Sequence, residues 1–246
     1  KATLKSASDH KIDSPGLHFQ MATLAFAEND QATADRELEL ARSAPQISVS
    51  VLTFQASLAA LHGQIRRALA FNQKAVEAAQ RLNLKEGVGN LHAQRAVGQA
   101  NFGFSKDAIA SAEQALKASD SSDVKLTAAL AFAVAGDESR ALKLSEEVSK
   151  VRPYDTFVQF VSVPLIRGQI ELRKGNAAKT IDLMDTAMLY GRTNGDVAYL
   201  RGNAYLKLNQ PADAVQAFQH LLDLRPSDPT NPLRALAQRG LGQAYA

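Results

Sequence analysis

The sequence predicts an all-α fold made of repeated helical hairpins, and three observations support this prediction. Alanine, the best intrinsic helix former, occupies 43 of the 246 positions, against 14 glycines and 8 prolines. Tryptophan is absent, and the β-branched Val and Ile that favour strands are sparse. Small residues recur at fixed offsets, and the apolar residues between them fall at three- and four-residue steps, which is helical periodicity.

A turn-prone Gly or Asn marks the middle of each predicted hairpin. Gly or Asn just past a helix relieves the left-handed backbone conformation, and small residues where two helices cross let their axes approach. The turn positions are Asn29, Gly63, Gly103, Gly136, Gly175 and Asn209. Small residues precede them by seven positions at Ala22, Ala56, Ala96, Ala129, Gly168 and Gly202. A second set follows five residues after each turn, at Ala34, Ala68, Ala108, Ala141, Thr180 and Ala214.

The hairpins follow one another along nearly the whole chain. Residues 1–13 are interpreted as an N-terminal segment or the end of a preceding repeat. Prolines close the first, fourth and sixth hairpins, at Pro45, Pro153 and Pro226, because proline cannot continue a helix. We expect hairpins at about 14–45, 46–82, 83–120, 121–153, 154–191 and 192–228, and a partial seventh at 229–246.

The spacing of the turns alternates between short and long. Successive turn positions lie 34, 40, 33, 39 and 34 residues apart. The additional residues belong either to longer helices or to longer loops, and residues 81–89 and 152–158 are where the difference is expected. The sequence leaves both alternatives open.

The sixth hairpin carries a resemblance to a known family. Gly202, Tyr205, Ala214, Phe218 and Pro226 stand at the spacing of tetratricopeptide (TPR) repeats. The stretch 241–245, LGQAY, repeats the first-helix signature, whereas Arg201 and Gln99 stand where the family usually has Leu and Tyr. The resemblance implies a right-handed α-solenoid of about six TPR-like helical hairpins plus a partial seventh.

A narrower resemblance concerns the larger protein. The phrases at 12–15, 155–160 and 201–206 are similar to the C-terminal TPR region of bacterial transmembrane serine/threonine protein kinases. This resemblance implies a parent with a cytoplasmic kinase, one membrane span and a repeat-rich sensor region, of which this chain would be the extracytoplasmic part. Related arrays follow winged-helix transcription regulators, which is the alternative parent. Lys1 is not Met, so we expect a fragment or a processed product.

Motifs that would indicate catalysis or a cofactor are absent from the sequence. There is no cysteine, phosphate-binding loop, dinucleotide fingerprint or kinase signature, and no two histidines stand four residues apart. The tetrads Ser8–Lys11 and Ser122–Lys125 match a Ser-x-x-Lys pattern that arises by chance in most chains of this length. We therefore predict no catalytic residue, no cofactor and no metal site, and the chain is expected not to be an enzyme.

Charge and hydropathy exclude two further partners. The 28 basic and 25 acidic residues give a net charge of +3 and are interleaved, so no nucleic-acid partner is predicted. The longest apolar runs, such as Ala128 to Ala135, are far shorter than the roughly 20 residues of a membrane-spanning helix. No membrane span is therefore predicted in this chain.

The TPR resemblance implies a groove lined by the first helix of each hairpin, where a peptide or protein partner binds. Any one of the groove residues could instead pack against a neighbouring hairpin. Carried over position by position, they are Phe19, Thr23, Phe26, Thr53, Ser57, Val97, Asn101, Leu126, Leu130, Leu165, Gln169, Arg173, Tyr199, Asn203, Lys207, Arg239 and Gln243.

The predicted function is a non-catalytic protein- or peptide-binding module, acting as the sensor or scaffold region of a signalling protein. The groove is apolar in the middle and offers donors in its C-terminal third, which suits an amphipathic segment with an acidic end. The alternative is an oligomerisation scaffold, in which copies stack through the C-terminal hairpin around Leu236 and Leu241.

Overall fold

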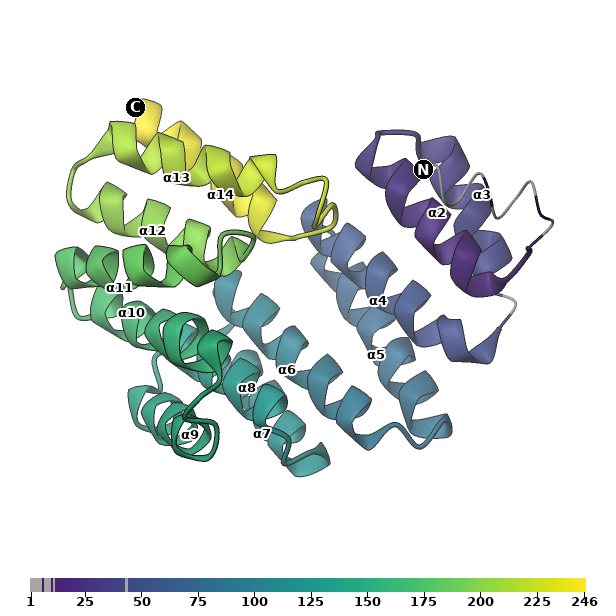
Figure 1. Cartoon of the computed structure of the whole chain (residues 1–246), viewed down its shortest axis with the longest axis horizontal. Coiled ribbons are helices and arrows are strands. Elements are labelled where there is room, and N and C mark those ends of the chain that lie inside the picture. Colours follow the sequence, from purple (N-terminus) through teal and green to yellow (C-terminus); the bar gives the residue numbers. More distant parts are fainter. Residues whose placement is uncertain (1–5, 7–9, 11, 43) are drawn as a thin grey trace. The chain divides into compact units, whose positions relative to one another are not determined.

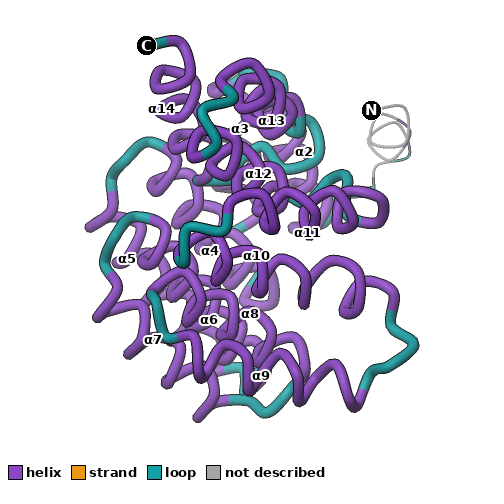
Figure 2. The backbone as a smooth tube through the Cα atoms, turned by 90° about the vertical axis from the view of Figure 1, so that its left-hand side faces the viewer, coloured by secondary structure: helices purple, strands orange, loops and turns teal. Residues whose placement is uncertain are grey.

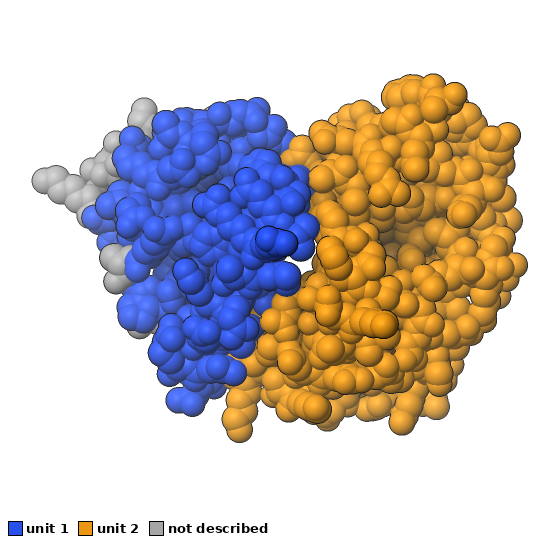
Figure 3. All heavy atoms as spheres, turned by 180° about the vertical axis from the view of Figure 1, so that it is seen from behind, with its two compact units in different colours: residues 1–83, 225–231 blue, residues 84–224, 232–246 orange. Residues whose placement is uncertain are grey.

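The computed structural model describes residues 6, 10, 12–42 and 44–246 (Figure 1). Most of the expected N-terminal segment 1–13, including Ser8 and Lys11, lies outside the described residues. Throughout the described ranges the regular elements are helices and no strand occurs, as Figure 2 shows. The all-α prediction is therefore confirmed. The chain divides into two compact units, coloured in Figure 3: unit 1 is residues 1–83 with 225–231, and unit 2 is residues 84–224 with 232–246.

Unit 1 consists of two helical hairpins. The first joins α2 (Pro15–Ala27) to α3 (Gln31–Ala41), and the second joins α4 (Pro45–Leu61) to α5 (Ile65–Arg81). The aromatic rings of Phe19 and Phe26 pack edge to face against Phe54 of α4, with ring centroids 5.9 and 5.8 Å apart. This aromatic cluster joins the two hairpins through one hydrophobic core.

A histidine bridges the two helices of the first hairpin. His18 Nδ1 lies 2.6 Å from Oε2 of Glu37 on α3, and His18 Nε2 lies 2.7 Å from Oδ1 of Asp13. Glu37 is only 4% exposed and also accepts hydrogen bonds from Arg36. An imidazole that donates from both nitrogens is protonated, and the hydrogen bond to Glu37 raises the pKa of His18 above its ordinary value.

Unit 2 is a solenoid of helical hairpins in which each first helix packs on its own second helix and on the next first helix. The first helices are α6, α8, α10, α12 and α14 in that order, and α7, α9, α11 and α13 are the second helices. The elements of unit 2, including the π-helical turn η1 immediately before α10, are α6 (Lys85–Asn101), α7 (Ser105–Ala118), α8 (Ser122–Ala135), α9 (Glu138–Val151), η1 (Val158–Ser162), α10 (Val163–Arg173), α11 (Ala177–Tyr190), α12 (Gly195–Lys207), α13 (Pro211–Asp223) and α14 (Leu233–Tyr245).

The turns inside the hairpins adopt the backbone conformation that the sequence indicated. All six predicted turn residues have positive φ, from 56° at Asn209 to 99° at Gly136. At two of these turns the following Asp caps the next helix: Asp30 accepts from Thr33 N and Asp137 from Arg140 N, each at 3.1 Å. The prediction of left-handed turns at Gly and Asn is confirmed.

Both long spacings between turns come mainly from long helices. Between Gly63 and Gly103, α5 and α6 are 17 residues each and are joined by only residues 82–84, so the helices are long. Between Gly136 and Gly175, α9 has 14 residues and residues 152–155 form the connection, after which one helical segment runs through residues 156–173 and includes η1 and α10. The η1 segment is a π-helical turn, and Pro164 shortly after it has no backbone N–H, which interrupts the α-helical hydrogen-bond pattern.

The last three helices of unit 2 pack around one phenylalanine. The ring of Phe218 on α13 is fully buried between Gly202 of α12 and Gly240 of α14. A Cβ added at either glycine would lie 2.5 Å from a ring carbon, so only glycine allows this approach. Gly242, which repeats the position of Gly202 in the next first helix, has nothing within 4 Å of its Cβ position.

Candidate functional site

All the expected groove residues of unit 2 come from five neighbouring first helices. Residues four apart on a helix share a face, so Tyr199, Asn203 and Lys207 form one stripe on α12. We call the accessible members of this set the first-helix stripe. They are Val97 and Asn101 of α6, Leu130 of α8, Gln169 and Arg173 of α10, Tyr199, Asn203 and Lys207 of α12, and Arg239 and Gln243 of α14. Figure 3 shows a hollow in the surface of unit 2.

Three of the expected groove residues are buried in hydrophobic clusters. Phe26, Leu126 and Leu165 are only 8%, 8% and 5% exposed. Leu126 belongs to the cluster around Phe132, and Leu165 packs in the cluster of Met184. A neighbouring helix covers these side chains, so they contribute to stability and leave little surface for a partner.

Most polar side chains of the first-helix stripe have unused hydrogen-bonding groups, and Gln169, Asn203, Lys207 and Arg239 are the four considered as donors for a partner. Gln169 and Asn203 are half-buried, whereas Lys207 and Arg239 are exposed. Within the described part of the chain, none of the four makes a side-chain hydrogen bond or an ion pair. These groups come from α10, α12 and α14, where the sequence predicted donors for a partner.

Two other cations on first helices, Arg201 and Lys125, are held in ion pairs. Arg201 Nε on α12 lies 2.8 Å from Asp185 Oδ1. Lys125 on α8 lies 2.6 Å from both Asp120 and Glu147, so the lysine of the Ser122–Lys125 pattern is held in ion pairs. The free cations Lys207 and Arg239 therefore differ from these neighbours in having no carboxylate.

Arg173 has a structural contact that the sequence did not predict. Its Nη1 donates to the backbone oxygen of Val134, 3.2 Å away, near the end of α8. Its guanidinium also lies over Gly136, where a Cβ would come within 2.6 Å of Nη2. Arg173 thus satisfies a carbonyl at a helix C-terminus and leaves only part of its donor capacity for a partner.

The expected groove residues of unit 1 mostly serve their own helices. Thr23 Oγ1 donates to Phe19 O at 2.9 Å, and Thr53 Oγ1 donates to Val49 O at 2.8 Å. Phe19 packs in the aromatic cluster described above, and Ser57 is half-buried. The unused polar groups of the candidate site therefore lie in unit 2.

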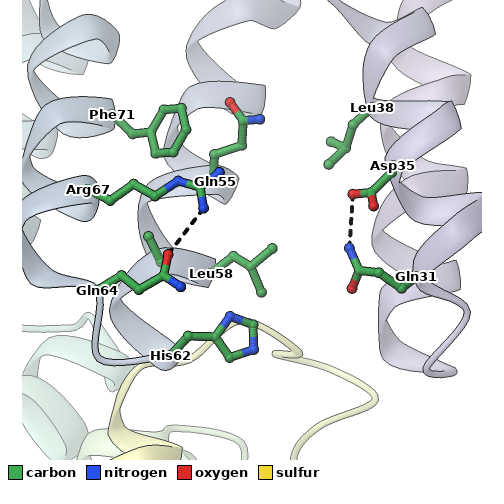
Figure 4. Close-up of a pocket in the computed structure, with 10 residues that line it drawn as sticks. Gln31, Asp35, Leu38, Gln55, Leu58, His62, Gln64, Arg67 and Phe71 are labelled. Carbon is green, nitrogen blue, oxygen red and sulfur yellow. Dashed lines mark hydrogen bonds between the residues drawn. The ribbon is translucent and has the colours of Figure 1, made fainter.

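Unit 1 holds a cleft that sequence reasoning missed. Figure 4 shows it between α3 on one side and α5 on the other, with side chains from the end of α4 between them. It has a volume of about 290 Å³. Its lining residues are Gln31, Asp35, Leu38, Gln55, Leu58, Ala59, His62, Gln64, Arg67 and Phe71. These residues come from three helices, and no spacing along the chain marks them as a set.

Neither a metal site nor a membrane-spanning helix occurs in the residues that the structure describes. Among the described residues, no three His, Asp or Glu side chains are grouped so that they could hold a metal ion. None of the helices in those residues combines the length and the apolar character needed to cross a bilayer.

Comparison with known proteins gives structural neighbours only. No protein-family model and no curated protein sequence matches this chain. A tetratricopeptide repeat protein from Parabacteroides merdae is 12% identical, with a TM-score of 0.46 over 94% of this chain and 99% of that chain. The TPR2AB-domain:pHSP90 complex of yeast Sti1 is 12% identical, with a TM-score of 0.40 over 94% and 98%.

A third neighbour binds a different ligand. The human IFIT1 dimer with m7Gppp-AAAA is 16% identical, with a TM-score of 0.48 over 94% of this chain and 64% of that chain. Identities below 25% and TM-scores below 0.5 give these similarities no weight in assigning a function. The functional argument therefore depends on this chain's own residues.

Proposed function

We propose that this chain is a non-catalytic protein- or peptide-binding module whose partner contacts the first-helix stripe of unit 2. One observation carries the proposal: Gln169, Asn203, Lys207 and Arg239 lie on three neighbouring first helices with their donors unused. Water satisfies these donors in the free chain, and a partner that supplies acceptors can replace that water and be oriented by them.

The chemistry of the first-helix stripe selects an acidic, amphipathic partner. Val97 and Leu130 offer apolar, half-buried surface on α6 and α8. Lys207 and Arg239 offer positive charge on α12 and α14. A helical or extended segment with apolar residues at one end and Asp or Glu at the other complements both parts.

A peptide array tests the proposal. The array carries amphipathic peptides with acidic ends, next to the same peptides with Asn and Gln in place of Asp and Glu. We expect the chain to prefer the acidic peptides and the double variant Asn203→Ala/Arg239→Ala to lose at least tenfold in affinity, because two charge-assisted or polar contacts are removed. The matched control is Lys106→Ala, an exposed cation on the second helix α7. Equal binding by the double variant and the control would contradict the assignment.

We further propose that the module is the sensor or scaffold region of a larger bacterial signalling protein of the serine/threonine kinase type. The sequence phrases that resemble such kinases support this proposal. The reading frame upstream of Lys1 tests it: a kinase domain followed by one apolar span would support the proposal, and a winged-helix domain would replace it with the alternative parent.

A second candidate function is self-association through α14. The observation that favours it is the open space at Gly242, because the equivalent Gly202 receives the ring of Phe218 from a second helix. A helix from another copy could fill this position. Light scattering at high protein concentration decides: a dimer that Leu241→Glu dissociates would support self-association, and a monomer at all concentrations would remove it.

A further inference from the structure

The cleft of unit 1 is lined by none of the residues of the first-helix stripe. All ten of its lining residues lie on α3, α4, α5 and the turn between α4 and α5. Its volume is about 290 Å³. This is near the lower end of the range of pockets that hold small organic ligands.

The two walls of the cleft carry opposite charges. Asp35 projects from α3, where Gln31 Nε2 donates to its Oδ1 at 2.9 Å and orients the carboxylate. Arg67 projects from α5 on the other side, where its Nη1 donates to Gln64 Oε1 at 3.2 Å. Figure 4 shows both charged groups turned toward the space between the helices.

Each charge is held in place but is not neutralised. The guanidinium carbon of Arg67 lies 5.5 Å from the ring centroid of Phe71, an arrangement that fixes its plane. Among the described residues, neither Asp35 nor Arg67 has an ion-pair partner, and the two do not pair with each other. The cleft therefore presents one free carboxylate and one free guanidinium on facing walls.

The surface between the charges is partly polar, from Gln55 and His62, and partly apolar. Leu38 and Ala59 are buried, with exposures of 5% and 4%. Leu58 and the ring of Phe71 are half-buried beside them. A ligand that spans the cleft would cover this apolar surface as it reaches from one wall to the other.

We propose that the cleft binds small zwitterions whose amino group and carboxylate lie at opposite ends of an apolar body. The amino group pairs with Asp35 and the carboxylate with Arg67, whose planar fork suits a two-oxygen acceptor. A free dipeptide with apolar side chains has this chemistry. Asp35 and Arg67 are both exposed, so a ligand with one charge would leave the opposite group to water and would gain one charge-assisted contact instead of two.

Titration of the full chain with the dipeptide Leu-Leu, N-acetyl-Leu-Leu and Leu-Leu-amide tests the proposal. We expect each blocked peptide to bind the wild type about tenfold more weakly than Leu-Leu, because each lacks one charge-assisted contact. In Asp35→Asn, N-acetyl-Leu-Leu should bind as well as Leu-Leu, whereas Leu-Leu-amide should still bind more weakly than Leu-Leu. In Arg67→Gln, Leu-Leu-amide should bind as well as Leu-Leu, whereas N-acetyl-Leu-Leu should still bind more weakly than Leu-Leu. This crossed pattern assigns each end of the ligand to one wall.

Two matched variants serve as controls. Glu39→Gln on α3 and Arg66→Gln on α5 change exposed charges outside the cleft, and both should keep wild-type affinity for all three peptides. Calorimetry gives the affinities, and the methyl resonances of Leu58 and Ala59 locate the ligand.

The outcomes separate this proposal from the proposed function. Unchanged Leu58 and Ala59 resonances at millimolar Leu-Leu would overturn it, as would equal binding of free and blocked peptides. Binding that Asn203→Ala/Arg239→Ala abolishes, while Asp35→Asn leaves it intact, would place the dipeptide on the first-helix stripe and also overturn it. Loss of partner binding at the stripe would leave the cleft assignment standing.

Discussion

The packing of Phe218 between two glycines makes a sharp prediction about two substitutions on one helix. Gly240→Ala adds a methyl group that would lie 2.5, 2.6 and 3.0 Å from three ring carbons of Phe218. Gly242→Ala, two residues later on α14, adds the same methyl group where nothing lies within 4 Å. The two variants therefore have the same chemical change but different surroundings.

The magnitude follows from how far the ring would have to move. Carbon atoms attract best at about 3.5–4.0 Å, so relief at Gly240 needs a displacement of about 1 Å. The ring cannot make that move toward α12, because Gly202 is already as close on the other side. Overpacking of this kind costs about 1–3 kcal/mol, and replacing a helical glycine returns up to about 1 kcal/mol. We expect Gly240→Ala to lower the free energy of unfolding by about 1–2 kcal/mol and Gly242→Ala to leave it unchanged or raise it slightly.

Amide hydrogen exchange is the suitable assay, because solenoids open in segments and a global melt averages over them. The exchange rates of α13 and α14 should rise in Gly240→Ala and stay at or below the wild-type rates in Gly242→Ala. In a Phe218→Leu background the penalty of Gly240→Ala should shrink, since the smaller side chain leaves room. If Gly240→Ala protects α13 and α14 as well as wild type does, the packing argument is wrong.

Three further predictions concern other parts of the fold. His18, paired with Glu37, has a raised pKa, so its stabilisation is complete below its ordinary pKa of 6.5 and is lost as the pH rises through the raised value. The free energy of unfolding of the wild type, measured by urea titration, should fall from pH 6 to 9. If the free energy of unfolding of His18→Gln falls equally steeply with pH, this account is wrong. Gly136 has φ of 99°, so Gly136→Ala should lower the free energy of unfolding by about 1–2 kcal/mol in thermal or urea unfolding, and Gly136→Asn should lower it less. Equal stability of the two variants would argue against a conformational cause. Thr180 is fully buried, and its Oγ1 donates a hydrogen bond to Gly168 O at 3.1 Å. Thr180→Val should therefore lower the free energy of unfolding by about 1 kcal/mol in the same assay. A Val variant as stable as the wild type would mean that the hydroxyl contributes nothing to stability.

The hairpins could be predicted because each depends on local residues. A Gly or Asn at a turn, such as Gly103 or Asn209, acts within a few positions of its own helix, so its effect is visible in the sequence. The cause of the spacing alternation could not be predicted. A longer helix and a longer loop lengthen the sequence pattern in the same way, and only the structure shows that α5, α6 and the helical segment 156–173 are the long parts.

The site was less predictable because it depends on contacts between hairpins. Transfer of family positions identified Gln169 and Asn203 as groove residues, and the structure leaves both with unused groups. The same transfer included Leu126 and Leu165, which neighbouring helices bury. It offered no signal for the cleft of unit 1, whose charged walls belong to separate hairpins and meet only after these pack together.

The most direct test of peptide recognition by the first-helix stripe is a nuclear magnetic resonance titration of side-chain amide groups. An acidic amphipathic peptide selected on the array is added to the full chain, and the NH₂ signals of Gln169, Asn203 and Gln243 are followed. Binding at the stripe should shift these three signals in proportion to occupancy and leave those of Gln114 and Gln219, on second helices, in place. If the peptide saturates the chain while the NH₂ signals of Gln169, Asn203 and Gln243 do not shift, this account of how the protein works is wrong.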